Sequence, residues 1–226
     1  MKILYVIPAR GGSKGIPHKN IKPLNGKPLI YYSIDVARQL TTDEHICVST
    51  DDEEIIEVVE NYGLKVPFIR PNHLATDSAT TNDVLLHVIE YFESKGIYYD
   101  TVVLLQPTSP LRNVIHVNES LKLFNDTLDM VVSVKESHAA SVICSENENG
   151  FLELFINKSA KRRQDISSFY EYNGAIYVIN VSRLKNKGIN GFSLNRKYLM
   201  DQISSYDIDS PIDWLIVESI IKSKKL

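Results

Sequence analysis

Cysteine is scarce in this chain, which has only Cys47 and Cys144 in 226 residues. So few cysteines exclude a fold held together by a framework of disulfides. Cys47 lies in the apolar segment 45–49, where a buried free thiol is the expected state. No His/Cys cluster has the spacing of a zinc site, and no Ser-His-Asp set is evident, so neither kind of catalytic centre is expected.

The chain also lacks a long apolar run. No stretch approaches the roughly 18 residues that a membrane-spanning helix requires. The first residues do not follow the pattern of a secretory leader, in which a basic segment precedes an apolar stretch and a small-residue cleavage site. We therefore expect a soluble, cytoplasmic protein that has no membrane partner.

An excess of positive charge is missing as well. The formal net charge is -3, which argues against the broad basic surface of a nucleic-acid-binding protein. A length of 226 residues with 43% hydrophobic residues suits one sizeable core. We therefore expect a single domain over residues 1–226 and no nucleic-acid partner.

Short β-rich segments alternate with helical patterns along most of the chain. Strands are predicted at 2–7, 45–50, 65–69, 101–106, 129–134, 175–180 and 198–203. Helices are predicted after Pro28, between the acidic run 51–54 and Gly63, and at 80–95, 113–125 and 212–222. This alternation is typical of parallel strands joined by helical crossovers. The predicted fold class is α/β, with a mostly parallel twisted sheet and helices on both faces.

The alternation breaks between residues 135 and 172. Polar, glycine-punctuated and basic segments replace it, among them the strand-like GFLELF and the charged KSAKRRQD. We interpret 135–172 as an insertion that protrudes from the single domain. Such an arm would reach a partner subunit and contribute to dimerisation and to the substrate site.

Glycine and positive charge are concentrated directly behind the first strand. The segment PARGGSKGIPHKN, residues 8–20, holds three glycines together with Arg10, Lys14 and Lys19. Bare backbone N–H groups in such a turn form a nest for phosphate oxygens. The spacing excludes both GxxxxGK[ST] and GxGxxG. A loop for a mononucleoside triphosphate is predicted, the alternative being a tight turn with surface charges.

Polar residues also follow two later segments. Gln106-Pro107-Thr108-Ser109-Pro110 leaves a buried strand at the sheet edge where open α/β sheets bind ligands, although a plain turn is the alternative. Asp207 and Asp209 are separated by one residue, so an extended backbone directs both carboxylates to one face. Carboxylates combined with substrate phosphates are typical Mg²⁺ ligands, but two loop aspartates are also commonly solvated.

Four strings in the chain resemble the motifs of the acylneuraminate cytidylyltransferases, also called CMP-sialic acid synthetases. They are VIPARGGSKGIPHKNI, LLQPTSPLR (104–112), YNGAIYVI (172–179) and DIDSPIDW (207–214). The resemblance spans nearly the whole chain, in order and at plausible spacing. It implies a Rossmann-like nucleotidyltransferase that transfers CMP from CTP to the anomeric hydroxyl of an acidic nine-carbon sugar, N-acetylneuraminate or a related nonulosonate, and releases pyrophosphate.

The resemblance implies a nucleotide-binding role for Arg10, Gly11, Gly12, Ser13, Lys14, Lys19, Asn20, Arg70 and Thr81. Arg10, Lys19 and Asp209 are the implied catalytic residues, and Asp207 with Asp209 is the implied site for Mg²⁺ (or Mn²⁺). Alternatives remain for two residues of the set. Arg70 is also placed to pair with Asp77, and Thr80 or Thr81 is suited to cap the following helix.

The resemblance also implies an acceptor-sugar site formed by Gln106, Ser109, Arg163, Gln164, Asn173 and Tyr177. Arg163 is implied to reach in from the other subunit of a homodimer with exchanged arms, where a bidentate guanidinium suits the sugar carboxylate. A solvated basic arm is the alternative.

One departure from the family pattern leaves the acceptor open. Relatives commonly carry a proline with an aromatic residue or lysine nearby after the histidine of the arm, whereas here His138 is followed by Ala139-Ala140-Ser141. The two rival functions are a CTP-dependent transferase for another acid sugar, such as an eight-carbon keto-deoxy acid, and a non-catalytic nucleotide-binding homologue.

Overall fold

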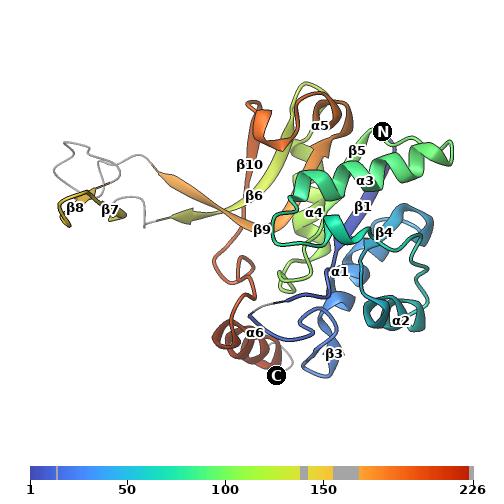
Figure 1. Ribbon diagram of the computed structural model, residues 1–226, viewed down its shortest axis with the longest axis horizontal. Helices are drawn as coiled ribbons and strands as arrows, with labels where there is room; N and C mark the ends of the chain where they lie inside the picture. Colours follow the sequence, from blue (N-terminus) through green and yellow to red (C-terminus); the bar gives the residue numbers. More distant parts are fainter. Residues whose placement is uncertain (14, 138–141, 155–167, 224–226) are drawn as a thin grey trace.

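The protein is built on a six-stranded sheet with the strand order β10-β6-β9-β5-β1-β4 (Figure 1). A computed structural model describes residues 1–13, 15–137, 142–154 and 168–223. The strands of this sheet are β1 (Ile3–Pro8), β4 (Ile46–Ser49), β5 (Thr101–Leu104), β6 (Met130–Ser137), β9 (Phe169–Asn180) and β10 (Asn195–Leu199). The helices are α1 (Leu29–Arg38), α2 (Glu53–Asn61), α3 (Thr81–Ser94), α4 (Val114–Leu123), α5 (Val181–Lys187) and α6 (Pro211–Ser223).

The direction of the strands fixes where a ligand site forms. β1 pairs in parallel with β4 and β5, and β10 pairs in parallel with β6. β9 is antiparallel to both of its neighbours, β5 and β6. The carboxyl ends of β1, β4 and β5 therefore lie side by side, and loops that follow such strands form the ligand crevice of open α/β sheets.

The two faces of the sheet are covered by different helices. Tyr5 and Ile7 of β1 belong to a buried cluster with residues of α1, α2 and α4. Leu4 and Val6, which point the other way, belong to a cluster with residues of α3 and α5. The period-two alternation of a strand thus buries both faces of β1, as its near-continuous apolar sequence predicts.

A third apolar cluster joins the beginning of the chain to its end. Ile16 of the glycine-rich loop packs with Ile208 and with Trp214 of α6, and all three are buried. Each such side chain contributes roughly 1.5–3 kcal/mol when it leaves water. This packing brings the glycine-rich loop next to residues 207–209, although the two segments are far apart in sequence.

The sequence predicts the α/β class and most elements correctly, with two errors in the strands. Residues 65–69 do not form a strand of the sheet, and only an isolated bridge joins Ile69 to Thr50. The last strand, predicted at 198–203, is β10 and ends at Leu199. Cys47 is a buried free thiol as predicted, and burial raises its pKa above the ordinary range.

The predicted insertion at 135–172 overlaps two strands. Lys135 to Ser137 of β6 pair with Phe169 to Glu171 of β9 as an extension of the sheet. Figure 1 shows β6 and β9 running away from the body toward a separate hairpin of β7 (Cys144–Glu146) and β8 (Leu152–Leu154). We call residues 135–137, 142–154 and 169–172 the arm. No helix in the described part of the chain is long and apolar enough to cross a bilayer.

Candidate active site

The glycine-rich loop lies at the carboxyl end of β1 and is fixed there by backbone contacts. Ala9 donates its N–H to the carbonyl of Ser49 at 2.9 Å, which ties the start of the loop to the end of β4. Gly11 donates its N–H to Asp51 at 3.2 Å, and a Cβ at Gly11 would come within 2.1 Å of the Asp52 carboxylate. Only glycine therefore allows the loop to approach the turn after β4 so closely.

Lys19 joins this loop to the aspartate pair. Its Nζ donates to the Ile208 carbonyl at 2.7 Å and lies 3.3 Å from Asp209 Oδ1. Gly15 approaches the Asp209 backbone closely, because a Cβ at Gly15 would come within 2.3 Å of the Asp209 carbonyl oxygen. The glycine-rich loop and residues 208–209 are therefore in direct contact.

A cavity of about 400 Å³ opens where the loop, the β5 edge and the aspartate pair meet. It combines three cationic or hydroxyl groups from the loop with an amide and two carboxylates from distant segments. Its lining residues are Pro8, Arg10, Ser13, Gly15, Lys19, Asn20, Gln106, Pro107, Thr108, Asp207 and Asp209. Positive groups thus face negative groups across one space, an arrangement suited to a phosphate chain held together with a cation.

The two aspartates have different surroundings. Ser109 donates its hydroxyl to Asp207 at 3.1 Å, and burial raises the pKa of Asp207, with a further contribution from the negative charge of Asp209. Asp209 keeps 79% of its side chain exposed. One carboxylate is therefore held in place, while the other faces the open side of the cavity.

A second cavity, of about 280 Å³, adjoins the first and shares Pro8 and Arg10 with it. Its remaining lining is largely apolar with hydroxyl groups: Arg70, Leu74, Thr76, Asp77, Ala79, Thr80, Thr81, Val84, Leu85 and Leu104. Arg10 forms an ion pair with Asp77 at 2.9 Å. Arg10 therefore lies between a charged cavity and a more apolar one.

The alternatives for Arg70 and the threonines are resolved in part. Arg70 is buried, and it donates to the Ser49 hydroxyl at 3.0 Å and to the Ser49 carbonyl. Thr80 caps α3 in a capping box with Asp83, as the alternative interpretation predicts. Thr81 is the first helical residue and lines the second cavity.

The predicted sugar-site residues differ in whether they lie at the cavity and Asp207 or bond inside the protein. Gln106 lines the first cavity, and Tyr177 is close enough to Asp207 that its pKa rises through burial and that charge. Ser109 is buried against Asp207. Asn173 is buried too, with its amide donating to Ser205 at 2.9 Å and its oxygen accepting from Ser133 at 2.6 Å. The amide of Asn173 is thus used inside the protein.

Several predicted residues lie outside the described part of the chain. They are Lys14, Arg163, Gln164 and the segment His138 to Ser141. Conversely, Gly15 and Thr108 line the first cavity without having been predicted as site residues. Both lie within sequence strings that carry the family resemblance, so treating every residue of those strings as a site candidate would have found them.

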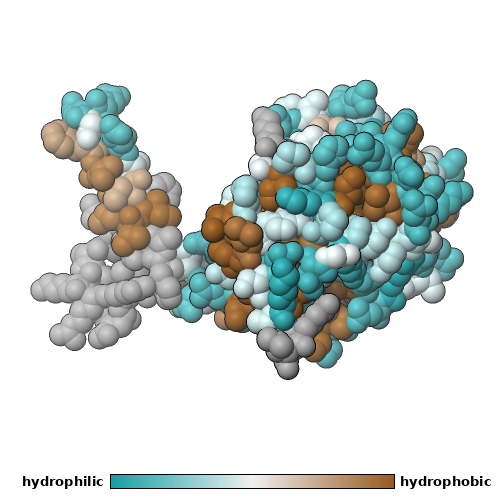
Figure 2. Space-filling model, turned by 90° about the horizontal axis from the view of Figure 1, so that it is seen from below, coloured by the Kyte–Doolittle hydropathy of each residue, from teal (hydrophilic) through white to brown (hydrophobic). Residues whose placement is uncertain are grey.

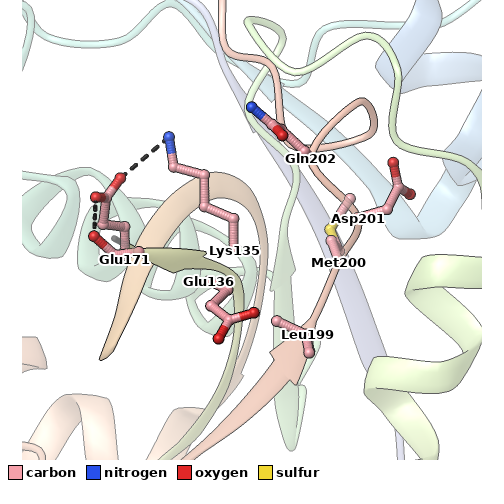
Figure 3. A pocket seen from close by; sticks show the side chains of 8 residues that line it. Lys135, Glu136, Glu171, Leu199, Met200, Asp201 and Gln202 are labelled. Carbon is pink, nitrogen blue, oxygen red and sulfur yellow. Dashed lines mark hydrogen bonds and ion pairs between the residues drawn. The ribbon is translucent and has the colours of Figure 1, made fainter. Parts of the chain in front are cut away.

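A further cavity of about 650 Å³ lies at the base of the arm (Figure 3). Figure 3 shows Lys135 and Glu171 paired on one side, with Leu199 and Asp201 on the opposite side. The Lys135 Nζ lies 3.1 Å from Glu171 Oε2. Lining residues are Lys135, Glu136, Ser137, Glu171, Leu199, Met200, Asp201 and Gln202. None of its described lining residues was predicted for the site, and it shares none of them with the two adjoining cavities.

The fold and the adjoining cavities define an α/β protein with a charged cleft at the carboxyl edge of its sheet. A family model described as cytidylyltransferase matches residues 4–226, and the chain belongs to that family of nucleotidyltransferase enzymes. A CMP-N,N'-diacetyllegionaminic acid synthase of Legionella pneumophila is 36% identical over 228 residues, covering 98% of this chain and 97% of the relative.

Two further likenesses agree with this assignment. An N-acylneuraminate cytidylyltransferase of Escherichia coli is 36% identical over 99% of this chain and 53% of the relative's length. A solved CMP:2-keto-3-deoxy-manno-octonic acid synthetase complexed with CTP has a TM-score of 0.71 at 19% identity, covering 99% of this chain and 100% of the other, and supports the fold. The predicted resemblance to acylneuraminate cytidylyltransferases is confirmed.

Proposed function

We propose that this enzyme transfers CMP from CTP to the anomeric hydroxyl of an acidic nine-carbon sugar, a nonulosonate. The observation that carries the proposal is the cavity in which Lys19 and Arg10 face Asp207 and Asp209, with Gln106 at its edge. Relatives similar over nearly the whole chain are named for legionaminic and N-acylneuraminic acids.

The two adjoining cavities suggest how CTP lies. The triphosphate occupies the first cavity, with its oxygens on the Ser13 hydroxyl, the Lys19 ammonium and the loop N–H groups. The cytosine and ribose occupy the second, more apolar cavity beside Thr81 and Arg70. Arg10 lines both and is therefore placed at the α-phosphate end of the chain.

The reaction then requires little covalent chemistry from the protein. The acceptor's anomeric oxygen bonds to the α-phosphorus, the bond from that phosphorus to the bridging oxygen breaks, and pyrophosphate leaves with that oxygen. The hydroxyl proton passes to solvent. Arg10 and Lys19 stabilise the charge that develops on the phosphates, which is the main source of acceleration in such transfers.

Asp207 and Asp209 fit a site for Mg²⁺, or for Mn²⁺ in its place. They offer hard carboxylate oxygens, one fixed by Ser109 and one exposed, opposite the phosphate loop. No group of three His, Cys, Asp or Glu residues in the described ranges is arranged to hold a metal ion. Nucleotide oxygens would therefore complete the shell, and a bound cation would neutralise phosphate charge.

This arrangement predicts that metal binding depends on the nucleotide. Calorimetry should detect tight Mg²⁺ binding in the presence of CTP and weak binding without it. Asp209→Asn should raise the Mg²⁺ concentration for half-maximal activity, whereas Asp43→Asn, which removes a carboxylate paired with Arg38, should not. Equal metal requirements for these two variants would contradict the assignment.

The arm supports a proposal of homodimerisation. Val142, Ile143, Phe151, Leu152 and Leu154 are all exposed apolar residues of the arm, and Figure 2 shows apolar side chains gathered there, apart from the body. Such a patch commonly marks a protein interface. A second subunit would cover it. Sedimentation of the wild type and of a Phe151→Asp variant tests this.

The decisive experiment is incubation with CTP, Mg²⁺ and a panel of acid sugars. We expect pyrophosphate release and a CMP-sugar of matching mass with N-acetylneuraminate, legionaminate or pseudaminate. Turnover only with an eight-carbon keto-deoxy acid would establish the rival transferase. CTP binding without turnover on any acid sugar would establish a non-catalytic homologue.

A further inference from the structure

Arg112 is a buried arginine behind the catalytic edge. It follows the Gln106–Ser109 turn and is only 2% exposed. Its Nη1 donates to the carbonyls of Gln106, at 3.1 Å, and of Ala175, at 3.0 Å. Its Nη2 donates to the Ser33 hydroxyl at 2.6 Å. One guanidinium therefore joins α1, the turn after β5 and the middle of β9.

Stability alone does not account for a cation in this position. No ion pair involves Arg112 in the described part of the chain, and its buried Nε has no hydrogen-bond partner there. Taking a guanidinium out of water is costly, and apolar replacements of buried charges are often neutral or stabilising. Burial lowers the pKa of Arg112 to about 9, and the negative charge of Asp207 opposes that shift.

The groups that Arg112 contacts all lead to the acceptor half of the site. The Gln106 carbonyl also accepts the Ser109 N–H at 3.4 Å, and Ser109 in turn donates its hydroxyl to Asp207 at 3.1 Å. On β9, Ala175 follows Gly174, where an added Cβ would lie 2.7 Å from the Gln106 side-chain oxygen. Small displacements of this turn would therefore move both Gln106 and the carboxylate of Asp207.

We propose that Arg112 is a positioning residue that sets the geometry of the acceptor and metal side of the site, through its fork of hydrogen bonds to Gln106, Ala175 and Ser33. Its guanidinium is linked to Asp207 through the Gln106 carbonyl and Ser109. The inference rests on the proposed cytidylyl transfer and assigns Arg112 no contact with CTP. Its removal should thus affect acceptor and metal, and leave nucleotide binding largely intact.

The test compares Arg112→Met and Arg112→Lys with the wild type. Arg38→Met is the matched control, because Arg38 also uses its guanidinium for internal bonds, to Asp43 and the Tyr62 carbonyl, but lies outside the cavities. Wild-type turnover is established first, so that a failure of the proposed function appears before any variant is compared.

For Arg112→Met we expect kcat to fall by about 100-fold, as misplacement of a site by about 1 Å causes. The KM for the acceptor and the Mg²⁺ requirement should rise several-fold, with the CTP dissociation constant at saturating Mg²⁺ nearly unchanged. Arg112→Lys retains the charge without the planar fork. Its Mg²⁺ requirement should therefore be close to that of the wild type, whereas its KM for the acceptor should stay above the wild-type value. Hydrogen exchange should accelerate in 104–112 and remain unchanged in 8–20.

Two results would overturn the proposal. One is unchanged kinetics in Arg112→Met, and the other is a parallel loss of CTP and acceptor binding, which would indicate general unfolding. If Arg112→Met does not fold, Arg112→Lys decides: equal acceptor KM in that variant and the wild type would exclude a role for the fork. Arg38→Met should lower the melting temperature without altering any of these constants.

Discussion

Lys19 Nζ lies 3.3 Å from Asp209 Oδ1, although 190 positions separate the two residues in the chain. The ammonium group also donates to the Ile208 carbonyl at 2.7 Å and is largely shielded from solvent. The first and last parts of the chain thus meet at one point, where the phosphate loop faces the proposed metal ligands. A cation already lies against Asp209 in the free protein.

Lys19→Met should lower kcat/KM by about 100-fold to 1,000-fold, the usual effect of losing one preorganised donor to a developing charge. Lys22→Met is the control, because the Lys22 ammonium lies over the Trp214 ring, 4.9 Å from its centroid, and does not line either adjoining cavity. Steady-state kinetics with saturating acceptor measures the effect. Similar rates for the two variants would exclude a catalytic role for Lys19.

Gly15→Ala and Gly12→Ala should differ sharply. A Cβ at Gly15 would lie 2.3 Å from the Asp209 carbonyl oxygen, whereas a Cβ at Gly12 meets nothing within 4 Å. Gly15→Ala must therefore push the loop away from the aspartate pair and weaken CTP binding at least tenfold, an effect of about 1.4 kcal/mol. Gly12→Ala keeps its backbone N–H and should bind CTP as the wild type does, which calorimetry can check.

Asp77→Asn should strengthen CTP binding. The ion pair with Asp77 engages Arg10, and it is exposed enough to be worth about 0.2–1 kcal/mol. Removing the competing carboxylate should tighten CTP binding by about 1.4-fold to 5-fold at low salt, with a smaller effect at high salt because of screening. Weaker binding of CTP at every salt concentration would show instead that Asp77 orients Arg10 for the nucleotide.

Asp129→Asn should destabilise the fold in a pH-dependent way. Lys187, together with the N–H groups of Leu194 and Ser193, lowers the pKa of Asp129 to about 2 from an ordinary value of 3.8. A lowered carboxyl pKa contributes stability above pH 3.8, and that contribution is lost as the pH falls toward 2. Urea unfolding should therefore separate variant and wild type at pH 7 and bring them together near pH 2.

The sequence allowed the sheet to be predicted because most strands and helices obey simple periodic patterns. The segment 65–69 is apolar enough for a strand, but Pro67 offers no N–H to a ladder, and one bridge at Ile69 is all that forms. The short helix α5 was missed, because it spans only seven residues and begins at a side-chain cap from Asn180. Apolar periodicity alone therefore does not predict such short or proline-interrupted segments correctly.

Site residues were predictable where several polar or charged residues stand close together in the sequence. The glycine-rich loop was predicted from its composition, and the role of Asp207 and Asp209 was implied by the resemblance. Residues of both segments line the same cavity. Asn173 was expected to meet the sugar, yet its amide bonds to Ser133 and Ser205 inside the fold, a tertiary fact that no local pattern contains. Its contact with an acceptor stays a prediction.

β9 runs from Phe169 in the arm to Asn180 in the central sheet, and it carries Gly174 and Tyr177 between them. A ladder to β6 holds its arm end and residues 177–179, and a ladder to β5 holds residues 177–180. A displacement of the arm should therefore be transmitted through β9 to the edge of the sheet where the reaction is proposed to occur. An antibody fragment that clamps the β7–β8 hairpin should alter the turnover rate from a distance, without touching either substrate.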